Sequence, residues 1–129
     1  MTAPPTGVQT FDGEIATYWF EDGILVSLSK SVKRTVENIS SNVALVKKIT
    51  NNKKVPLLIY LQNSPIPDKE TRRFSTEQLP NIYLAMAMIS PKGLATLIMN
   101  ILFKFKPAPI PIKSFTDEQA AKEWLKQFI

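Results

Sequence analysis

The chain of 129 residues contains no cysteine and no histidine, and its formal net charge is +5. Disulfides and zinc–thiolate sites are thereby excluded, and the commonest general base and metal ligand is missing, so we expect neither a metal nor a cofactor. An apolar fraction of 44% and a charged fraction of 21% are typical of an ordinary globular domain that is long enough to bury a core.

The first ten residues, MTAPPTGVQT, are rich in proline and threonine and show no core-facing pattern. We interpret residues 1–10 as an N-terminal arm and residues 11–129 as a single domain. The arm has no cationic stretch followed by an apolar run, so no secretory signal is expected, and the lack of cysteine also favours a cytoplasmic protein. The longest apolar run falls far short of the roughly 20 residues that cross a bilayer.

A β-hairpin is predicted at the start of the domain. Two runs rich in β-forming residues, at 14–20 and 24–29, flank Asp22 and Gly23, the dipeptide that best tolerates the positive φ of a tight turn. In the second run, one side is formed by Ile24, Val26 and Leu28, and the other by Leu25, Ser27 and Ser29. We therefore expect one buried face and one face that is partly wet.

The periodicity changes to that of a helix between residues 31 and 50. Apolar residues recur there at spacings of three and four, which places them in one stripe. Ser31 is the predicted N-cap, and Asn51 with Asn52 is expected to end the helix. The next run, VPLLIYLQ at 55–62, is apolar without alternation, which predicts a central strand covered on both faces.

The next two elements are a polar helix and an apolar strand. Asp68 can cap a helix that extends to about Gln78 and is anchored mainly by Phe74. The run IYLAMAMIS at 82–90 is predicted as a strand, although a helix could also be built from it. Its two sides are Ile82, Leu84, Met86 and Met88 against Tyr83, Ala85, Ala87 and Ile89.

The stretch SPKGLATLIMNILFKFKPAP, at 90–109, is more apolar than a surface helix requires. A helix is predicted at 91–105, with a polar stripe of Lys92, Thr96, Asn100 and Lys104. Because a surface helix needs an apolar stripe of only about 100°, this helix has more apolar residues than packing on the core requires. The set expected to face the sheet is Leu94, Leu97, Ile98 and Ile101. The surplus is Met99, Leu102, Phe103 and Phe105, which must pack on a second copy, a partner, a lipid or neighbouring helices.

Two elements complete the chain. The run PIPIKSF at 109–115 can only be an edge strand, because Pro109 and Pro111 cannot donate ladder hydrogen bonds. A final helix is predicted from a capping box formed by Thr116 and Gln119. Its predicted buried face consists of Ala120, Ala121, Trp124, Leu125 and Phe128.

Strand–helix alternation after a hairpin indicates an α/β protein with a single mixed, mainly parallel sheet and helices packed on it. The sequence resembles the SpoIIAA-like fold of STAS domains, which is related to CRAL-TRIO lipid-binding domains, and most of all small bacterial members of that group. The resemblance covers about residues 11–129 and rests on the opening hairpin, on AMAMISPKGLATLIMNILFKFKPAPIPIKSF and on the ending FTDEQAAKEWL. It implies a fold and leaves the activity open.

STAS regulators carry a phosphorylatable serine in an Asp-Ser-Gly type of turn after the central strand. The corresponding place here reads YLQNSPIPD, so the resemblance matches Ser64, beside Asn63, to that switch position. However, no aspartate precedes Ser64, no glycine follows it, and Pro65 and Pro67 each remove an N–H donor for a phosphoryl group. We therefore interpret Ser64 as a polar loop residue and expect no regulatory phosphorylation there.

Two further patterns have both a structural and a functional interpretation. Lys69, Arg72 and Arg73 could bind an anion across the loop from Ser64, but a solvated helix face explains them at least as well. The methionines at positions 86, 88 and 99 could line an adaptable hydrophobic pocket, although core filling is the favoured interpretation.

Two functional hypotheses follow from the surplus apolar residues at 91–105. The first is a non-catalytic cytoplasmic binding or regulatory module that forms a homodimer and has an unknown protein partner. Its interface residues are predicted to be Met99, Leu102, Phe103, Lys104 and Phe105. The second is a carrier of a lipid-like ligand, or a peripheral membrane protein, with the ligand beneath this helix and with Lys104 and Lys106 near headgroups.

Other functions are less well supported by the residues. Catalysis by carboxylates or lysines remains an alternative, but no acidic cluster and no glycine-rich phosphate loop is apparent. Nucleic-acid binding is not expected, because the lysines are scattered and do not gather in one basic patch.

Overall fold

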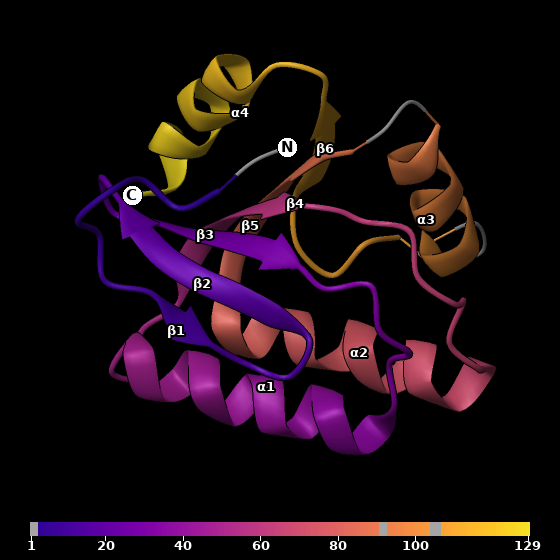
Figure 1. The fold of residues 1–129 in the computed structure, drawn as a ribbon. Helices are drawn as coiled ribbons and strands as arrows, with labels where there is room; N and C mark the ends of the chain where they lie inside the picture. Colours follow the sequence, from indigo (N-terminus) through magenta and orange to yellow (C-terminus); the bar gives the residue numbers. More distant parts are fainter. Residues whose placement is uncertain (1–2, 91–92, 104–106) are drawn as a thin grey trace.

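The computed structural model describes residues 3–90, 93–103 and 107–129, without the side chain of Leu102 (Figure 1). Within these ranges, six strands and four α-helices follow one another. They are β1 (Phe11–Asp12), β2 (Ala16–Glu21), β3 (Ile24–Ser29), α1 (Val36–Ile49), β4 (Val55–Tyr60), α2 (Lys69–Ile82), β5 (Tyr83–Ile89), α3 (Leu94–Phe103), β6 (Ile112–Phe115) and α4 (Glu118–Leu125), with a 3₁₀ turn, η1 (Lys126–Phe128), at the end. Residues 3–10 form no helix or strand.

The strands form one sheet in the order β1-β2-β3-β4-β5-β6. Strands β1 to β3 pair antiparallel and β3 to β6 pair parallel, which confirms the predicted mixed, mainly parallel sheet. The predicted hairpin is also confirmed, because Asp22 and Gly23 adopt φ values of 50° and 83° at its turn. Strand β4 lies between two parallel neighbours and β6 lies at the edge, as their sequences predict.

The helices are divided unequally between the two faces of the sheet. Strands β3 to β6 follow one another in space in chain order, and right-handed crossovers then place all three connecting helices on the same face. Helices α1, α2 and α3 therefore lie on one face, and α4 alone covers the other (Figure 1). The apolar core is accordingly split into two clusters, one on each face.

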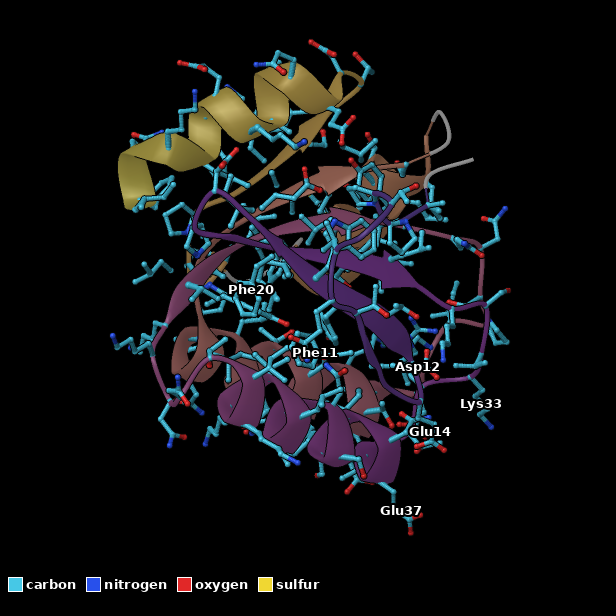
Figure 2. All side chains as sticks on the ribbon, turned by 60° about the vertical axis from the view of Figure 1, so that its left-hand side comes forward. Phe11, Asp12, Glu14, Phe20, Lys33 and Glu37 are labelled. Carbon is cyan, nitrogen blue, oxygen red and sulfur yellow. The ribbon has the colours of Figure 1, made fainter. Side chains whose placement is uncertain are left out.

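The short β1 extends the sheet over the side of α1. Phe11 of β1 and Phe20 of β2 meet edge to face, with ring centroids 6.3 Å apart (Figure 2). Phe11 packs against the core on the face of α1, whereas Phe20 is 36% exposed. The pair therefore closes the edge of the sheet rather than forming a binding surface.

The first helix begins later than the sequence predicts. Its N-cap is Thr35 and not Ser31, and Thr35 and Asn38 exchange reciprocal side-chain to backbone hydrogen bonds. Residues before Thr35 stay outside the helix because the guanidinium of Arg34 donates to the carbonyls of Lys30 and Val32. The predicted end is confirmed, since the residues at 51 and 52 have φ values of 56° and 62°.

The last helix also has a different cap from the predicted one. Asp117, and not Thr116, accepts hydrogen bonds from the backbone N–H groups of Gln119 and Ala120. Ala121 and Leu125 are fully buried, as predicted, but Ala120 is exposed. A carboxylate at the N-cap also interacts favourably with the helix dipole, which explains why Asp117 rather than Thr116 is the cap.

Helix α2 continues past the predicted end near Gln78. Asp68 caps it as predicted, and the helix extends to Ile82 with Pro80 in its last turn. Because proline has no backbone N–H, one helical hydrogen bond is missing at this position. The N–H of Tyr83 still donates to the carbonyl of Leu79.

A bulge in β5 changes the predicted alternation of that strand. Val55 pairs with Tyr83 but Pro56 pairs with Ala85, so Leu84 is extruded and remains 39% exposed. Tyr83 therefore shares the α1–α3 face with the methionines of β5, whereas the alanines face α4.

The side of β3 that faces α1 to α3 is buried, whereas the sequence predicts that it is partly exposed to solvent. Leu25, Ser27 and Ser29 are 0%, 1% and 4% exposed. The covering layer of α1 to α3 removes this face from solvent, even though two of its residues are serines.

Candidate functional site

A cavity of about 420 Å³ lies between the sheet and the layer of α1, α2 and α3. Its volume falls in the range of about 300–1,000 Å³ that is usual for small-ligand sites. Two of its walls are the 61–67 loop, which follows the carboxyl end of β4, and α3, which follows β5. Ligands of open α/β sheets bind at this end of the parallel strands.

The floor of the cavity changes in polarity across the sheet. Strands β2 and β3 contribute the hydroxyl groups of Tyr18, Ser27 and Ser29. Strands β4 to β6 contribute the phenol of Tyr83, which bonds to Tyr18, and otherwise apolar side chains, namely Leu57, Ile59, Met86, Met88 and Ile112. The floor is therefore polar around Tyr18, Ser27, Ser29 and Tyr83 and apolar over the rest of β4 to β6.

Helix α3 forms the apolar wall of this cavity. Its lining residues are Leu94, Leu97, Ile98, Ile101 and Phe103. Ala95, which is 6% exposed, and Met99 pack instead against the core of the same face. Because the side chain of Ala95 is small, the first turn of the helix can approach the core closely.

The structure places the two predicted sets of α3 residues around the cavity and the core. The set assigned to the sheet lines the cavity, and one of its members, Leu97, is 49% exposed. From the surplus set, Met99 packs on the core and Phe103 is half-buried in the cavity wall. The side chain of Leu102, together with Lys104 and Phe105, lies outside the described residues.

The 61–67 loop supplies the rim of the cavity opposite α3. Asn63 and Ser64 are exposed on this rim, and the carbonyl of Asn63 accepts a hydrogen bond from the Ser31 hydroxyl. The cap of α2 is Asp68, so Ser64 is not its N-cap residue. Ile66 of this loop is 59% exposed and also lines the cavity, as does Leu97. The exposed part of the lining therefore combines apolar residues with polar ones.

A hydrogen-bonded cluster occupies the polar end of the floor. The Tyr18 hydroxyl donates to Oδ1 of Asn42 over 2.8 Å, and Tyr18 also bonds to the hydroxyls of Ser27 and Tyr83. Burial raises the pKa of both tyrosines. Their phenols therefore stay protonated at neutral pH and act as hydrogen-bonding groups rather than as bases.

The charged groups of the cavity lining are two arginines, Arg34 and Arg72. Nη1 of Arg34 donates to the carbonyls of Lys30 and Val32 over 2.6 and 2.7 Å, and Nη2 donates to the carbonyl of Ile15 over 3.2 Å. Burial lowers the pKa of Arg34, but a guanidinium titrates so high that it remains charged. Arg72 donates to the carbonyl of Pro67 over 2.6 Å.

Sequence reasoning identified part of this site. The methionines of β5 as pocket residues and Arg72 as an anion ligand were only alternatives to the favoured interpretations of core filling and a solvated helix face, and Arg34 was missed. The available signal was the pair of serines at 27 and 29, because two hydroxyls on one side of an interior strand suit a polar cavity better than a packed core.

Metal binding and membrane insertion find no support in the described ranges. No group of three acidic side chains lies close enough together there to hold a metal ion. The helices of this part of the chain are also too short or too polar to pass through a membrane.

Comparison with solved structures supports the fold. The chain is similar to an uncharacterized protein of the DUF3478 family with a SpoIIAA-like fold from Shewanella loihica PV-4, with a TM-score of 0.54 and 16% sequence identity. The similarity covers 97% of this chain and 98% of the other, and it confirms the SpoIIAA-like fold alone.

Comparison of sequences defines the family. None of the curated proteins matches the chain. The domain of unknown function DUF7793, in contrast, matches residues 18–129, which include every element from β3 onward and β2 from Tyr18 to its end. The chain therefore belongs to the DUF7793 family.

Proposed function

We propose that the protein is a non-catalytic binding module that holds one small, largely apolar ligand in the cavity beneath α3. The observation that carries this proposal is the combination of a cavity of about 420 Å³ with an apolar wall formed by one helix. An apolar wall in contact with water is unfavourable, so a ligand that displaces this water gains free energy. The apolar residues of α3 that line the cavity thereby acquire a role that needs no second chain.

The position of the cavity supports the same function. The 61–67 loop and α3 follow the carboxyl ends of adjacent parallel strands, and both line the cavity. Ile66 of the loop and Leu97 of the helix are exposed to solvent. Exposed apolar residues in the lining give an apolar ligand a favourable path from solution into the cavity.

The chemistry of the lining favours binding over catalysis. Of the described residues, no aspartate, glutamate or lysine lines the cavity. The phenols of Tyr18 and Tyr83 have raised pKa values, and the remaining polar groups are hydroxyls, amides and guanidinium groups. A general base that is active near neutral pH is therefore missing from this lining.

Two neighbouring residues of β4 allow a matched test of ligand binding. Ile59 lines the cavity, whereas the next residue, Leu58, is fully buried on the α4 face. We expect wild-type protein to bind dodecanol or dodecanoate saturably at one site, measured by displacement of Nile red. Ile59→Phe should weaken this binding, because the larger ring occupies the cavity.

Leu58→Phe is the control for that experiment. It adds the same ring on the opposite face and should leave binding intact, although overpacking costs about 1–3 kcal/mol of stability. A typical domain, stable by about 5–15 kcal/mol, remains folded after such a loss. Absence of saturable binding to the wild type would contradict the proposed function.

Self-association is a second proposal, favoured by the exposure of Leu97 and Ile66 on one rim. A second copy of the chain placed over the opening would cover both residues. We expect a dimer in sedimentation equilibrium that Leu97→Glu dissociates. Thr96→Glu is the matched control, because Thr96 is exposed on the same helix and does not line the cavity. A wild type that stays monomeric at high concentration would contradict this second proposal.

A further inference from the structure

We infer that the ligand is an anionic single-chain amphipath, with a carboxylate-type head at Arg34 and its hydrocarbon chain directed toward β4–β6 and α3. This inference rests on the proposed function and specifies the chemical class of its ligand. It depends on the charge of the cavity lining, on the free donors of one guanidinium group and on the polarity gradient of the floor.

The charge of the lining is positive and unbalanced. Arg34 and Arg72 line the cavity without any carboxylate among the described lining residues. The ion pairs of the described residues are all made by lysines, and neither arginine takes part in one. A half-buried cation without a counter-ion is costly, and a bound anion removes part of that cost.

Acidic residues close to Arg34 or to the residues it bonds do not supply this counter-charge. Glu14 and Glu37 are exposed near the start of α1 (Figure 2) and form no ion pair with Arg34. Asp12 pairs with Lys30 instead, with 2.8 Å between the carboxylate and the ammonium group.

Hydrogen bonds hold the guanidinium group of Arg34 in place but do not involve all of its N–H donors. Three of its N–H groups donate to backbone carbonyls, two from Nη1 and one from Nη2. A guanidinium has five N–H donors, so the Nε hydrogen and one Nη2 hydrogen have no partner among the described residues. A carboxylate is an acceptor that forms strong, charge-assisted hydrogen bonds with such donors.

The same carbonyl contacts locate the group at the polar end of the cavity. They link Arg34 to Ile15, just before β2, and to Lys30, just after β3. The hydroxyls of Tyr18 and Ser29 line the cavity from these two strands. A head placed here has hydroxyl groups on one side and a fixed cation on the other.

Arg72 is less suited to bind the head. It lies in α2 close to Asp68, whose pKa is lowered by hydrogen bonds from Thr71 and also by the charges of Lys33 and Arg72. Arg72 therefore already has a carboxylate neighbour. Of the charged or titratable groups around Arg34, the phenol of Tyr18 is the one that affects its pKa, after the larger effect of burial.

The remainder of the cavity suits a hydrocarbon chain. Apart from Tyr83, the floor from β4 to β6 is apolar, and the lining residues of α3 are all apolar. Met86 and Met88 belong to this end, and their flexible thioethers adapt to chains of different shape. The polarity of the ligand thus matches the polarity of the floor from one end to the other.

A pair of ligands with the same chain tests the charge of the head. Dodecanoate and dodecanol are titrated into wild-type protein, Arg34→Gln and Arg73→Gln at neutral pH. Arg73 is the matched control because it is exposed on α2 and does not line the cavity. Loss of a charge-assisted hydrogen bond corresponds to about tenfold or more in affinity. We therefore expect dodecanoate to bind wild type and Arg73→Gln about tenfold more tightly than dodecanol, and Arg34→Gln to show no preference.

The outcomes separate this inference from the proposed function. Equal affinity of both ligands for the wild type would overturn the anionic head and leave the binding function standing, whereas failure of both to bind would overturn both. Loss of the preference in Arg72→Gln but not in Arg34→Gln would overturn the assignment to Arg34. Should Arg34→Gln fail to fold, the comparison of the two ligands on the wild type still decides whether the head is anionic.

Discussion

The two faces of the sheet share the same strands but are covered in different ways. On the α4 face, the small Ala87 and Ala121 allow the helix to approach closely, and Trp19, Leu58 and Leu125 are at most 1% exposed. On the other face, three helices cover the strands and leave a cavity of about 420 Å³. The comparison teaches that the covering helices, rather than the strands, decide where this fold can hold a ligand.

The pairing of charged groups also differs between the two faces of the sheet. On the α4 face the carboxylate of Glu21 accepts from Nζ of Lys122 over 2.9 Å and from Nε1 of Trp19 over 2.7 Å. Glu118 in turn accepts from Lys122 and from the Tyr60 hydroxyl. Each charge of this network has an opposite charge within hydrogen-bond distance, whereas Arg34 donates, among the described residues, to backbone carbonyls and to no carboxylate. The α4 face is therefore complete without a ligand.

The largest expected difference between the faces is in the cost of removing a side chain. Leu125→Ala leaves a void in a packed core and should lower the free energy of unfolding by about 2–5 kcal/mol. Ile98→Ala shortens a side chain that already borders a cavity and is partly exposed, so it should cost clearly less. Urea unfolding of both variants measures the difference, and equal losses would show that α3 packs as tightly as α4.

A smaller difference is expected when a side chain is enlarged. Leu58→Phe overpacks the α4 face and should destabilise the protein by about 1–3 kcal/mol. Ile59→Phe extends into the cavity and should leave the free energy of unfolding nearly unchanged. Thermal unfolding of the two variants provides the measurement. If Ile59→Phe were the more destabilising change, the space under α3 would be closed in solution.

The smallest expected difference concerns acid stability. Burial opposes ionisation of Glu21, but the hydrogen bonds from Lys122 and Trp19 outweigh it and lower the pKa of this carboxyl below the ordinary value of 4.5. Because the folded-state pKa is depressed, the contribution to stability is complete above pH 4.5 and is lost as the pH falls through the folded-state value. The stability of Glu21→Gln should therefore depend less on pH in acid. Unfolding curves over this range, compared with those of the exposed control Glu123→Gln, test the expectation, and parallel pH profiles for wild type and Glu21→Gln would refute it.

Sequence patterns predicted the sheet well because they report on local conformation. The turn at Asp22 and Gly23, the unbroken apolar run of β4 and the prolines before β6 each restrict the backbone to few choices. Topology then followed from the order of elements and the handedness of crossovers. Two N-caps, those of α1 and α4, were misassigned because several polar residues lie close together at each helix start, and contacts such as those of Arg34 selected among them.

The cavity could not be predicted from the sequence for a physical reason. Periodicity identifies which residues share a side of a helix, but it does not give the distance between that side and the sheet. In α3 the short side chain of Ala95 sets the contact with the core, and the larger residues beside it then border an open space. The bulge at Leu84 likewise reversed the predicted side of Tyr83, and Tyr83 is part of the cavity floor.

Binding of a ligand beneath α3 is tested most directly by nuclear magnetic resonance, because the reporters are already divided between the faces. Met86 and Met88 line the cavity, whereas both tryptophans of the chain, Trp19 and Trp124, belong to the α4 face. Protein with isotope-labelled methionine methyls and tryptophan indoles is titrated with dodecanoate. We predict saturable shifts of the two methionine methyls with unchanged indole resonances. Unchanged methionine methyls at saturating ligand, or shifts confined to the indoles, would contradict a ligand site under α3.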